Sequence, residues 1–211
     1  MRLGSDGFVV EEGLDQHYEV LKELGDCHTA LGHFDRARQC YEEAALLAPD
    51  NPGPHVGRGV IGLECGSMDE AERAFREALD ADAACAEAWA GLAMVFQQRR
   101  QFSDAFEMYM KCLQRDPDNL AALLGLFQAS RQMGTFARVI GYLEAYLDRH
   151  PGDASVLFCL ASLYARDGRL REAEDALQAV LALLPESGDA AALLDEVRRR
   201  LAASPAEAHR P

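Results

Sequence analysis

Residues 86–119 read AEAWAGLAMVFQQRRQFSDAFEMYMKCLQRDPDN. Apolar residues recur in this stretch at steps of three and four, in two segments, which is the spacing of amphipathic helices. The two apolar stripes consist of Trp89, Leu92, Ala93 and Phe96, then Phe102, Ala105, Tyr109 and Cys112. Pro117 closes the second segment, because proline cannot continue a helix interior. The stretch therefore predicts a pair of helices, neither of which can bury its apolar stripe alone.

The same arrangement recurs along the chain with a period of 34 residues. When positions are counted from Tyr18, position 32 of the five units holds proline or alanine: Pro49, Ala83, Pro117, Pro151 and Pro185. Position 15 holds glycine in four units, where a helix ends and a positive φ is often required: Gly32, Gly66, Gly134 and Gly168. A fixed period of this length predicts an array of stacked helix pairs.

The units resemble the tetratricopeptide repeat, which has Leu at position 7, a small residue at 8, aromatic residues at 11 and 24, and Ala at 20 and 27. The first unit matches with Leu24, Gly25, His28, Ala37, Tyr41 and Ala44. The third matches with Leu92, Ala93, Phe96, Ala105, Tyr109 and Cys112, and the fifth with Leu160, Ala161, Tyr164, Ala173, Leu177 and Val180. The resemblance implies an all-α fold, an α-solenoid in which helix-turn-helix repeats wind into a right-handed superhelix.

The period also divides the chain. We expect an N-terminal extension at 1–17, five repeats at 18–51, 52–85, 86–119, 120–153 and 154–187, a capping helix at 188–203 and a disordered tail at 204–211. The capping helix has an apolar stripe that includes Ala191 and Leu194. Its positions 8 and 11 are Asp195 and Arg198, the polar residues that the solvent-facing end of a stack needs.

Two units depart from the pattern. In the fourth, Phe127 stands at the small position 8 and Ser130 at the aromatic position 11, while Val139 and Tyr146 replace the two alanines. We expect the total volume to be kept while the two helices cross or separate differently.

In the second unit, the first helix contains three interior glycines, Gly57, Gly59 and Gly62. Each costs about 1 kcal/mol of helix propensity relative to alanine, so this helix is predicted to be the softest. The same glycines form a literal G-x-G-x-x-G, but a dinucleotide site needs that motif between a strand and a helix, and no strand pattern precedes it. Ser67 and Glu70 follow as a candidate capping box for the next helix.

The composition restricts the function. The formal net charge of −14 argues against binding to nucleic acid and to anionic membrane surfaces. No run approaches the roughly 20 apolar residues of a membrane span, and the first residues lack the pattern of a signal peptide. The six cysteines are scattered and fit small buried apolar residues. A cytoplasmic protein that does not insert into membranes is expected.

No pattern in the sequence indicates catalysis. The six histidines form no ligand spacing, and no cysteine–histidine pair has metal-site spacing, so neither a metal nor a cofactor is expected. Nothing places a nucleophile beside its base. The chain is therefore interpreted as a non-catalytic protein.

The resemblance implies a partner site on the concave face, which positions 2, 5, 9 and 12 of the first helices line in this family. The candidate partner-binding residues are Lys22, Asp26, Val56, Val60, Ala90, Met94, Gln97, Leu124, Gln128, Arg131, Phe158 and Ser162. Within the family, chaperone tails are held by a lysine at position 5 and asparagines at position 9. Here only Lys22 matches, whereas Asp26 and Val60 replace the asparagines, so an acidic chaperone tail is not expected.

The middle of this groove is apolar, which favours a partner site over a shallow, unused groove. The sequence therefore predicts a scaffold or assembly factor that binds a peptide or helix of a protein partner. Two alternatives remain open: a self-assembling homo-oligomeric scaffold and a regulatory subunit of an enzyme complex. The identity of the partner does not follow from the sequence.

Overall fold

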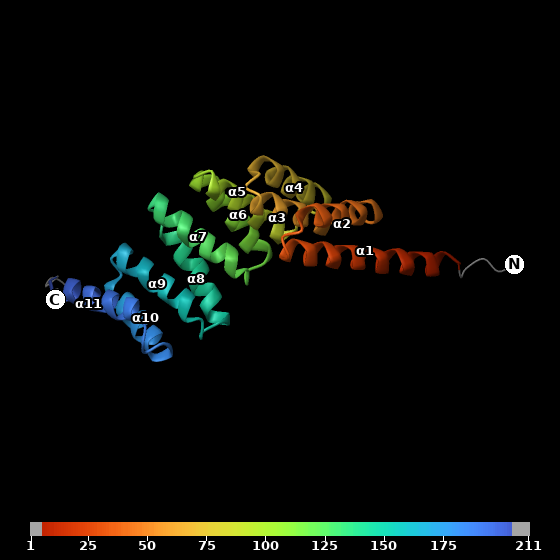
Figure 1. The fold of residues 1–211 in the computed structure, drawn as a ribbon. Coiled ribbons are helices and arrows are strands. Elements are labelled where there is room, and N and C mark those ends of the chain that lie inside the picture. Colours follow the sequence, from red (N-terminus) through yellow and green to blue (C-terminus); the bar gives the residue numbers. More distant parts are fainter. Residues whose placement is uncertain (1–5, 204–211) are drawn as a thin grey trace. The chain divides into compact units, whose positions relative to one another are not determined.

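The computed structural model describes residues 6–203, with side chains from Gln16 onward, and every regular element in this range is an α-helix (Figure 1). The helices are α1 (Asp6–Ala30), α2 (Phe34–Leu47), α3 (Gly53–Glu64), α4 (Met68–Ala81), α5 (Ala86–Gln98), α6 (Phe102–Arg115), α7 (Leu120–Met133), α8 (Ala137–Arg149), α9 (Ala154–Asp167), α10 (Leu170–Leu183) and α11 (Gly188–Ala203). The predicted all-α class is confirmed. The N-terminal extension is helical from Asp6 as part of α1, and the predicted tail at 204–211 lies outside the described residues.

The ends of the second helices follow the 34-residue period. The helices α2, α4, α6, α8 and α10 end at Leu47, Ala81, Arg115, Arg149 and Leu183, each two residues before position 32. A proline at position 32 explains four of these ends, since the residue before proline avoids the helical conformation. In the second unit, where Ala83 occupies position 32, the helix ends in the same register. The packing of the repeat, in addition to proline, therefore determines where the second helices end.

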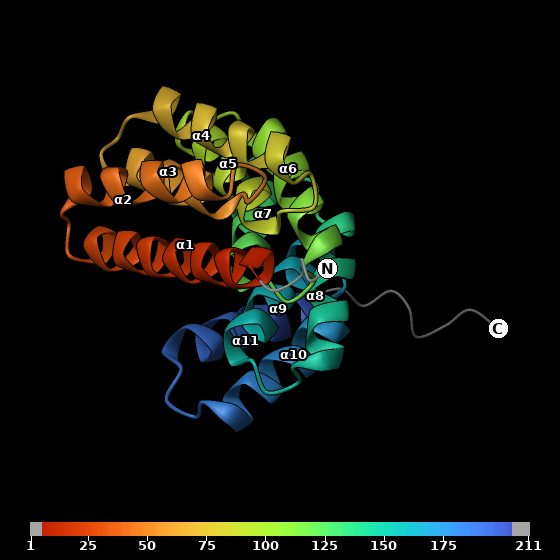
Figure 2. The same ribbon diagram turned by 90° about the vertical axis from the view of Figure 1, so that its right-hand side faces the viewer.

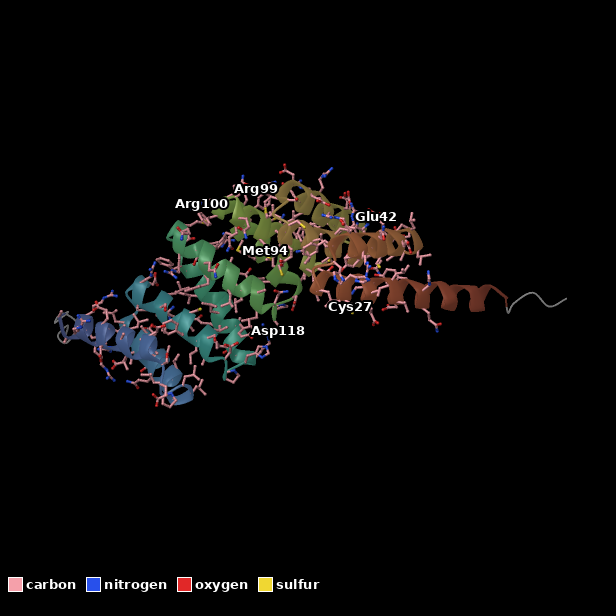
Figure 3. The ribbon with its side chains drawn as sticks, in the orientation of Figure 1. Cys27, Glu42, Met94, Arg99, Arg100 and Asp118 are labelled. Carbon is pink, nitrogen blue, oxygen red and sulfur yellow. The ribbon has the colours of Figure 1, made fainter. Side chains whose placement is uncertain are left out.

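The turns within the units depend on left-handed backbone at position 15. Gly32, Gly66, Gly134 and Gly168 have φ of 72°, 71°, 71° and 83°, as expected. In the third unit the same position is Arg100, with φ of 60° (labelled in Figure 3). A non-glycine residue in this conformation costs about 1–2 kcal/mol, so the repeat geometry overrides the local preference of the arginine.

The chain divides into two compact units, an N-terminal unit (Met1–Ala122) and a C-terminal unit (Leu123–Pro211). In the N-terminal unit, α1 packs on α2, α3 on α4 and α5 on α6, and successive pairs join through α2 with α3 and α4 with α5 (Figure 2). In the C-terminal unit, α9 packs on α8 and α10, and α11 packs on α10 and α9. Each unit is thus built from neighbouring helices in chain order.

Positions 3, 7 and 10 of a first helix form its buried stacking face. In α5 these are Ala88, Leu92 and Val95, which share one core with Phe75 and two alanines of α4. In α9 the same positions are Val156, Leu160 and Leu163, all buried. The family pattern emphasises positions 4, 8 and 11, so the sequence alone did not single out positions 3 and 10.

The two ends of the repeat series differ in this stacking face. In α11, the stacking-face residues Ala190, Leu194 and Val197 are buried. Ala191, which was predicted to belong to the apolar stripe of this helix, occupies position 4 and is exposed, so that prediction was wrong. In α1 no preceding helix covers the face among the described residues, and Val20 and Leu24 are 60% and 44% exposed.

The glycines of α3 have a steric role. A Cβ on Gly57 would lie 2.3 Å from Cζ of Tyr41, and one on Gly62 would lie 2.7 Å from the backbone N of Ala71. Real Cβ atoms essentially never come this close, so glycine allows α3 to approach α2 and α4. The glycines therefore lower the helix propensity of α3, but they also permit its close packing against α2 and α4. The softness of this helix stays a prediction.

Two further expectations were wrong. Ser67 is the N-cap of α4, but its side chain makes no capping hydrogen bond, so the Ser67–Glu70 capping box does not form. Cys27 and Cys65 are exposed rather than buried (Cys27 is labelled in Figure 3). Cys27 lies on the uncovered stacking face of α1, and Cys65 follows the last turn of α3, which explains their exposure.

Candidate functional site

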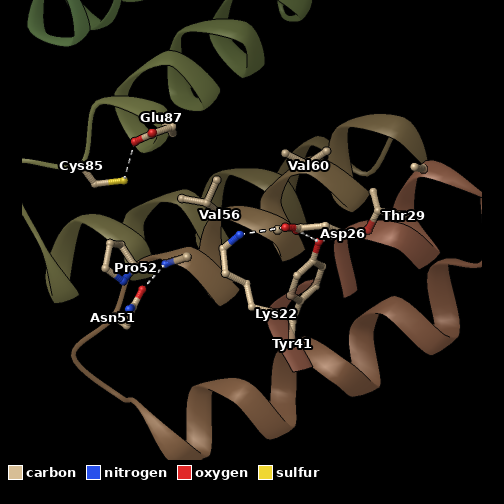
Figure 4. A pocket seen from close by; sticks show the side chains of 13 residues that line it. Lys22, Asp26, Thr29, Tyr41, Asn51, Pro52, Val56, Val60, Cys85 and Glu87 are labelled. Atoms are coloured by element: carbon tan, nitrogen blue, oxygen red, sulfur yellow. Dashed lines mark hydrogen bonds and ion pairs between the residues drawn. The ribbon is translucent and has the colours of Figure 1, made fainter. Parts of the chain in front are cut away.

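The N-terminal unit contains a pocket of about 500 Å³ bordered by α1, α3 and the start of α5, with Tyr41 of α2 at its base (Figure 4). Four of the predicted groove residues line it: Lys22, Asp26, Val56 and Val60. We call it the N-terminal pocket.

The charges on one side of the N-terminal pocket compensate one another. Nζ of Lys22 lies 2.8 Å from Oδ2 of Asp26, and the Tyr41 hydroxyl donates to Oδ1 of Asp26 at 2.7 Å (Figure 4). The hydroxyls of Thr29 and Tyr41 are 3.2 Å apart. The hydrogen bond to Asp26 raises the pKa of Lys22, and burial raises the pKa of Tyr41. This side is therefore polar but carries no surplus charge.

The opposite side of the N-terminal pocket is apolar. Val56 is half-buried and Val60 is 36% exposed, so both valines offer surface to a ligand. Glu87 lies at the edge, where Sγ of Cys85 is 3.5 Å from its Oε2. Burial raises the pKa of the Cys85 thiol, so Cys85 stays protonated at neutral pH and is a poor nucleophile. The pocket can accept an apolar side chain next to a polar group that faces Asp26 or Glu87.

The C-terminal unit contains a second pocket, of about 380 Å³, between α7, α9 and α11. Three predicted groove residues line it: Arg131, Phe158 and Ser162. Two further arginines, Arg166 and Arg200, complete its polar lining. We call it the C-terminal pocket.

The exchanged residues of the fourth unit shape the C-terminal pocket. Phe127 is half-buried and lines it, whereas Ser130 is fully buried and donates a hydrogen bond to the carbonyl oxygen of Phe127 at 2.7 Å. The guanidinium carbon of Arg131 lies 5.8 Å from the centre of the Phe127 ring, within range of a cation–π contact. Moving the aromatic residue from position 11 to position 8 thus contributes a ring to the pocket. The hypothesis of an altered helix crossing stays a prediction.

The remaining predicted groove residues line neither of these two pockets. They are Ala90, Met94, Gln97, Leu124 and Gln128. Gln97 accepts a hydrogen bond from the Tyr109 hydroxyl at 2.9 Å, and Met94 is exposed (Figure 3).

Arg166 and Arg200 were missed because the family's groove positions stop at 12. Both stand at position 13 of their units, so extending the series by one position would have identified them. Tyr41 was assigned only to the core, although its hydroxyl reaches the N-terminal pocket.

Among the side chains that the structure describes, from Gln16 to Ala203, no cluster of three or more His, Cys, Asp or Glu residues could hold a metal ion. Within residues 6–203, no helix is both long and apolar enough to cross a membrane. Burial raises the pKa of the Cys159 thiol in the C-terminal pocket to about 11, so it too stays protonated at neutral pH.

Three family models, each described as Tetratricopeptide repeat, match residues 18–51, 66–119 and 130–197. Cellulose synthase operon protein C of Xanthomonas axonopodis pv. citri (strain 306) is 31% identical over 176 residues, which is 78% of this chain and 12% of that protein. The CTR9 homolog of Arabidopsis thaliana is 27% identical over 200 residues, 86% of this chain and 18% of that protein. The chain thus spans less than a fifth of the length of these two relatives.

Solved structures show the same fold. The structure of pilF from Pseudomonas aeruginosa has a TM-score of 0.71 at 18% identity and covers 90% of each chain. A structure of YrrB, described as a TPR protein with an unusual peptide-binding site, has a TM-score of 0.65 at 16% identity and covers 83% of this chain and 90% of that one. At these identities the likeness concerns the fold alone.

Proposed function

Because the chain belongs to the tetratricopeptide repeat family, we propose that it is a non-catalytic interaction module that binds a peptide or helix of a partner protein along its first helices. One observation carries this proposal: the N-terminal pocket combines apolar surface on Val56 and Val60 with a fixed polar group at Asp26. Ligand sites of proteins typically have this composition and a volume of about 300–1,000 Å³.

The polar side of the pocket supports recognition of a peptide. Asp26 is held by Lys22 and Tyr41, so its position is set before a ligand arrives. A preorganised group loses little freedom on binding, which favours affinity. An apolar side chain of the partner would contact Val56 and Val60, and a neighbouring donor would face Glu87. In this proposal the module acts as a scaffold or assembly factor in the cytoplasm.

A peptide-display selection against the full chain tests this function. Selected peptides should lose binding to Val60→Asp, because an aspartate would place a charge against an apolar ligand side chain. Leu46→Asp is the matched control, since Leu46 is 83% exposed on α2 and does not line the pocket. Circular dichroism should show equal helicity in both variants. Equal binding by Val60→Asp and the control would exclude this pocket as the peptide site.

Self-assembly is a second candidate, and one observation favours it. Val20 and Leu24 are exposed apolar residues of α1, at the stacking face that other first helices bury. A second copy could cover them. Light scattering over a concentration series should show a mass that rises with concentration and returns to the monomer value in Leu24→Glu. A constant monomer mass would remove this candidate.

A further inference from the structure

We propose that the C-terminal pocket selects acidic segments, in which an apolar side chain is flanked by the carboxylates of Asp or Glu. The proposal rests on the proposed function as a peptide-binding module and adds the chemical class of the ligand at the C-terminal pocket. It is carried by the three arginines of that pocket, Arg131, Arg166 and Arg200.

The two units carry very different charge. Residues 1–122 contain 11 basic and 23 acidic side chains, a formal charge of −12, and residues 123–211 contain 10 basic and 12 acidic ones, a formal charge of −2. The acidity of the chain therefore resides almost entirely in the N-terminal unit. Acidic ligands meet much less repulsion at the C-terminal unit.

The arginines of the C-terminal pocket lack carboxylate partners within the described part of the chain. Other arginines of this unit are compensated: Nε of Arg169 lies 3.0 Å from Oε1 of Glu172, and Nε of Arg198 lies 2.8 Å from Oε1 of Glu174. Arg200 donates from Nη1 to the carbonyl oxygen of Ala165 at 2.7 Å, which anchors its guanidinium beside α9 without neutralising it. The positive charge at the pocket is therefore available to a ligand.

Guanidinium groups bind carboxylates through two parallel N–H donors, which gives strong and directional hydrogen bonds. Here such donors come from α7, α9 and α11, while Phe127 and Phe158 supply apolar surface between them. A ligand that satisfies both features has acidic residues on either side of an apolar one. The volume of about 380 Å³ suits a short segment with one such side chain.

The N-terminal pocket provides the internal comparison. Its one lysine, Lys22, is already paired with Asp26, and Glu87 adds a negative charge at its edge. An acidic segment gains no unpaired cation there. Selection for acid is therefore a property of the C-terminal pocket alone.

Fluorescence anisotropy with the full chain and two labelled peptides tests the proposal. The acidic probe is EDLFDE, and its amide counterpart is QNLFNQ, which has the same shape without the charges. We expect the acidic peptide to bind at least about ten-fold more tightly, and Arg131→Gln and Arg166→Gln each to weaken it by about ten-fold, as for loss of one charge-assisted hydrogen bond. Arg171→Gln removes an exposed arginine of α10 outside the pocket and should leave binding unchanged.

The outcomes separate this proposal from the proposed function. Equal affinity for both peptides, unaffected by either pocket variant, would overturn acid selection while leaving peptide binding in place. If Arg171→Gln also lost binding of the acidic peptide, binding would depend on the basic side chains of the unit in general and not on the C-terminal pocket, which would overturn the proposed site. Competition by millimolar inorganic phosphate as effective as that by the unlabelled peptide would identify a general anion site and also overturn it. Absence of binding to either peptide, while peptides selected by display still bind in a Val60-dependent way, would overturn this inference alone.

Discussion

The N-terminal and C-terminal pockets are built from equivalent first helices but offer different chemistry. In the N-terminal pocket, Lys22, Asp26 and Tyr41 satisfy one another, and what remains is mainly apolar surface. In the C-terminal pocket, Arg131, Arg166 and Arg200 are not compensated. First helices line both pockets, and a few side chains at positions 5 to 13, with Tyr41 of α2, give each pocket its chemistry.

The units also differ at their outer ends. Helix α11 covers the last repeat and presents Asp195 and Arg198 to solvent, whereas α1 leaves Val20 and Leu24 exposed. A stack without a polar end retains apolar surface that favours association. Because of this difference, the same substitution at equivalent positions of α1 and α11 should change the free energy of unfolding by unequal amounts.

The largest expected effect concerns Phe75, which is 1% exposed in the core formed by α4 and α5. Phe75→Ala should lower the free energy of unfolding by about 4 kcal/mol through lost burial and a cavity. Hydrogen exchange should show lost protection in α2 to α5, while α8 to α10 retain theirs. Equal loss in both groups of helices would mean that the two units unfold together, and would break the comparison.

The next effect compares two leucines at position 7. Leu194 of α11 is 6% exposed and Leu24 of α1 is 44% exposed. Leu194→Ala should cost about 3 kcal/mol and Leu24→Ala less than about 1 kcal/mol, as measured by urea denaturation. A similar cost for both would show that α1 is covered in solution, and a dependence of the Leu24 result on protein concentration would indicate self-association.

A smaller effect distinguishes glycines in the two units. Gly62→Ala in α3 should destabilise the protein by about 2 kcal/mol, because its Cβ would meet the backbone of Ala71. Gly141→Ala in α8 should stabilise it by about 0.5–1 kcal/mol, because no atom outside the neighbouring backbone of its own helix lies within 4 Å of the new Cβ, and alanine favours the helix. Denaturant midpoints of the two variants should move in opposite directions. Stabilisation by Gly62→Ala would show that α3 can yield, in agreement with the softness expected from its sequence.

The smallest effect concerns alkaline pH. Burial, and then the hydrogen bond from the Tyr164 hydroxyl to Glu144, raise the pKa of Tyr164 to about 12. A raised pKa stabilises the fold below the unfolded value near 10, and this contribution is lost as the pH rises toward 12. Between pH 10 and 11.5 the wild-type protein should lose more stability than Tyr164→Phe. Tyr142→Phe, which leaves the Tyr164–Glu144 bond intact, should behave like the wild type; identical curves for all three proteins would exclude this contribution.

The 34-residue period was sufficient to predict the fold, because each unit must bury the same stripe on its neighbour. The period did not show which face of α11 is buried. Ala191 was assigned to the buried face, but the structure buries Ala190 instead. The period also did not indicate that Arg100 would adopt the left-handed conformation, which glycine takes in the other units. The buried face of α11 depends on contacts between units, and the conformation of Arg100 follows from the turn geometry of the repeat, against the residue's own preference.

The candidate site could be predicted only in part. Seven of the predicted groove residues gather around the two pockets, four in one and three in the other. Arg166 and Arg200 were not found, because both stand at position 13, one position beyond the groove positions of the family. Their chemistry became apparent only when the structure placed them beside Arg131.

We propose that the two pockets bind ligands of different chemistry. Titration of the labelled full chain with the EDLFDE peptide, followed by backbone amide NMR, tests it most directly. We expect shifts to concentrate at residues 127–131, 158–166 and 193–200, with no saturable shifts at 22–30 or 52–60. Saturable shifts of equal size around both pockets, or shifts confined to the N-terminal pocket, would contradict the account.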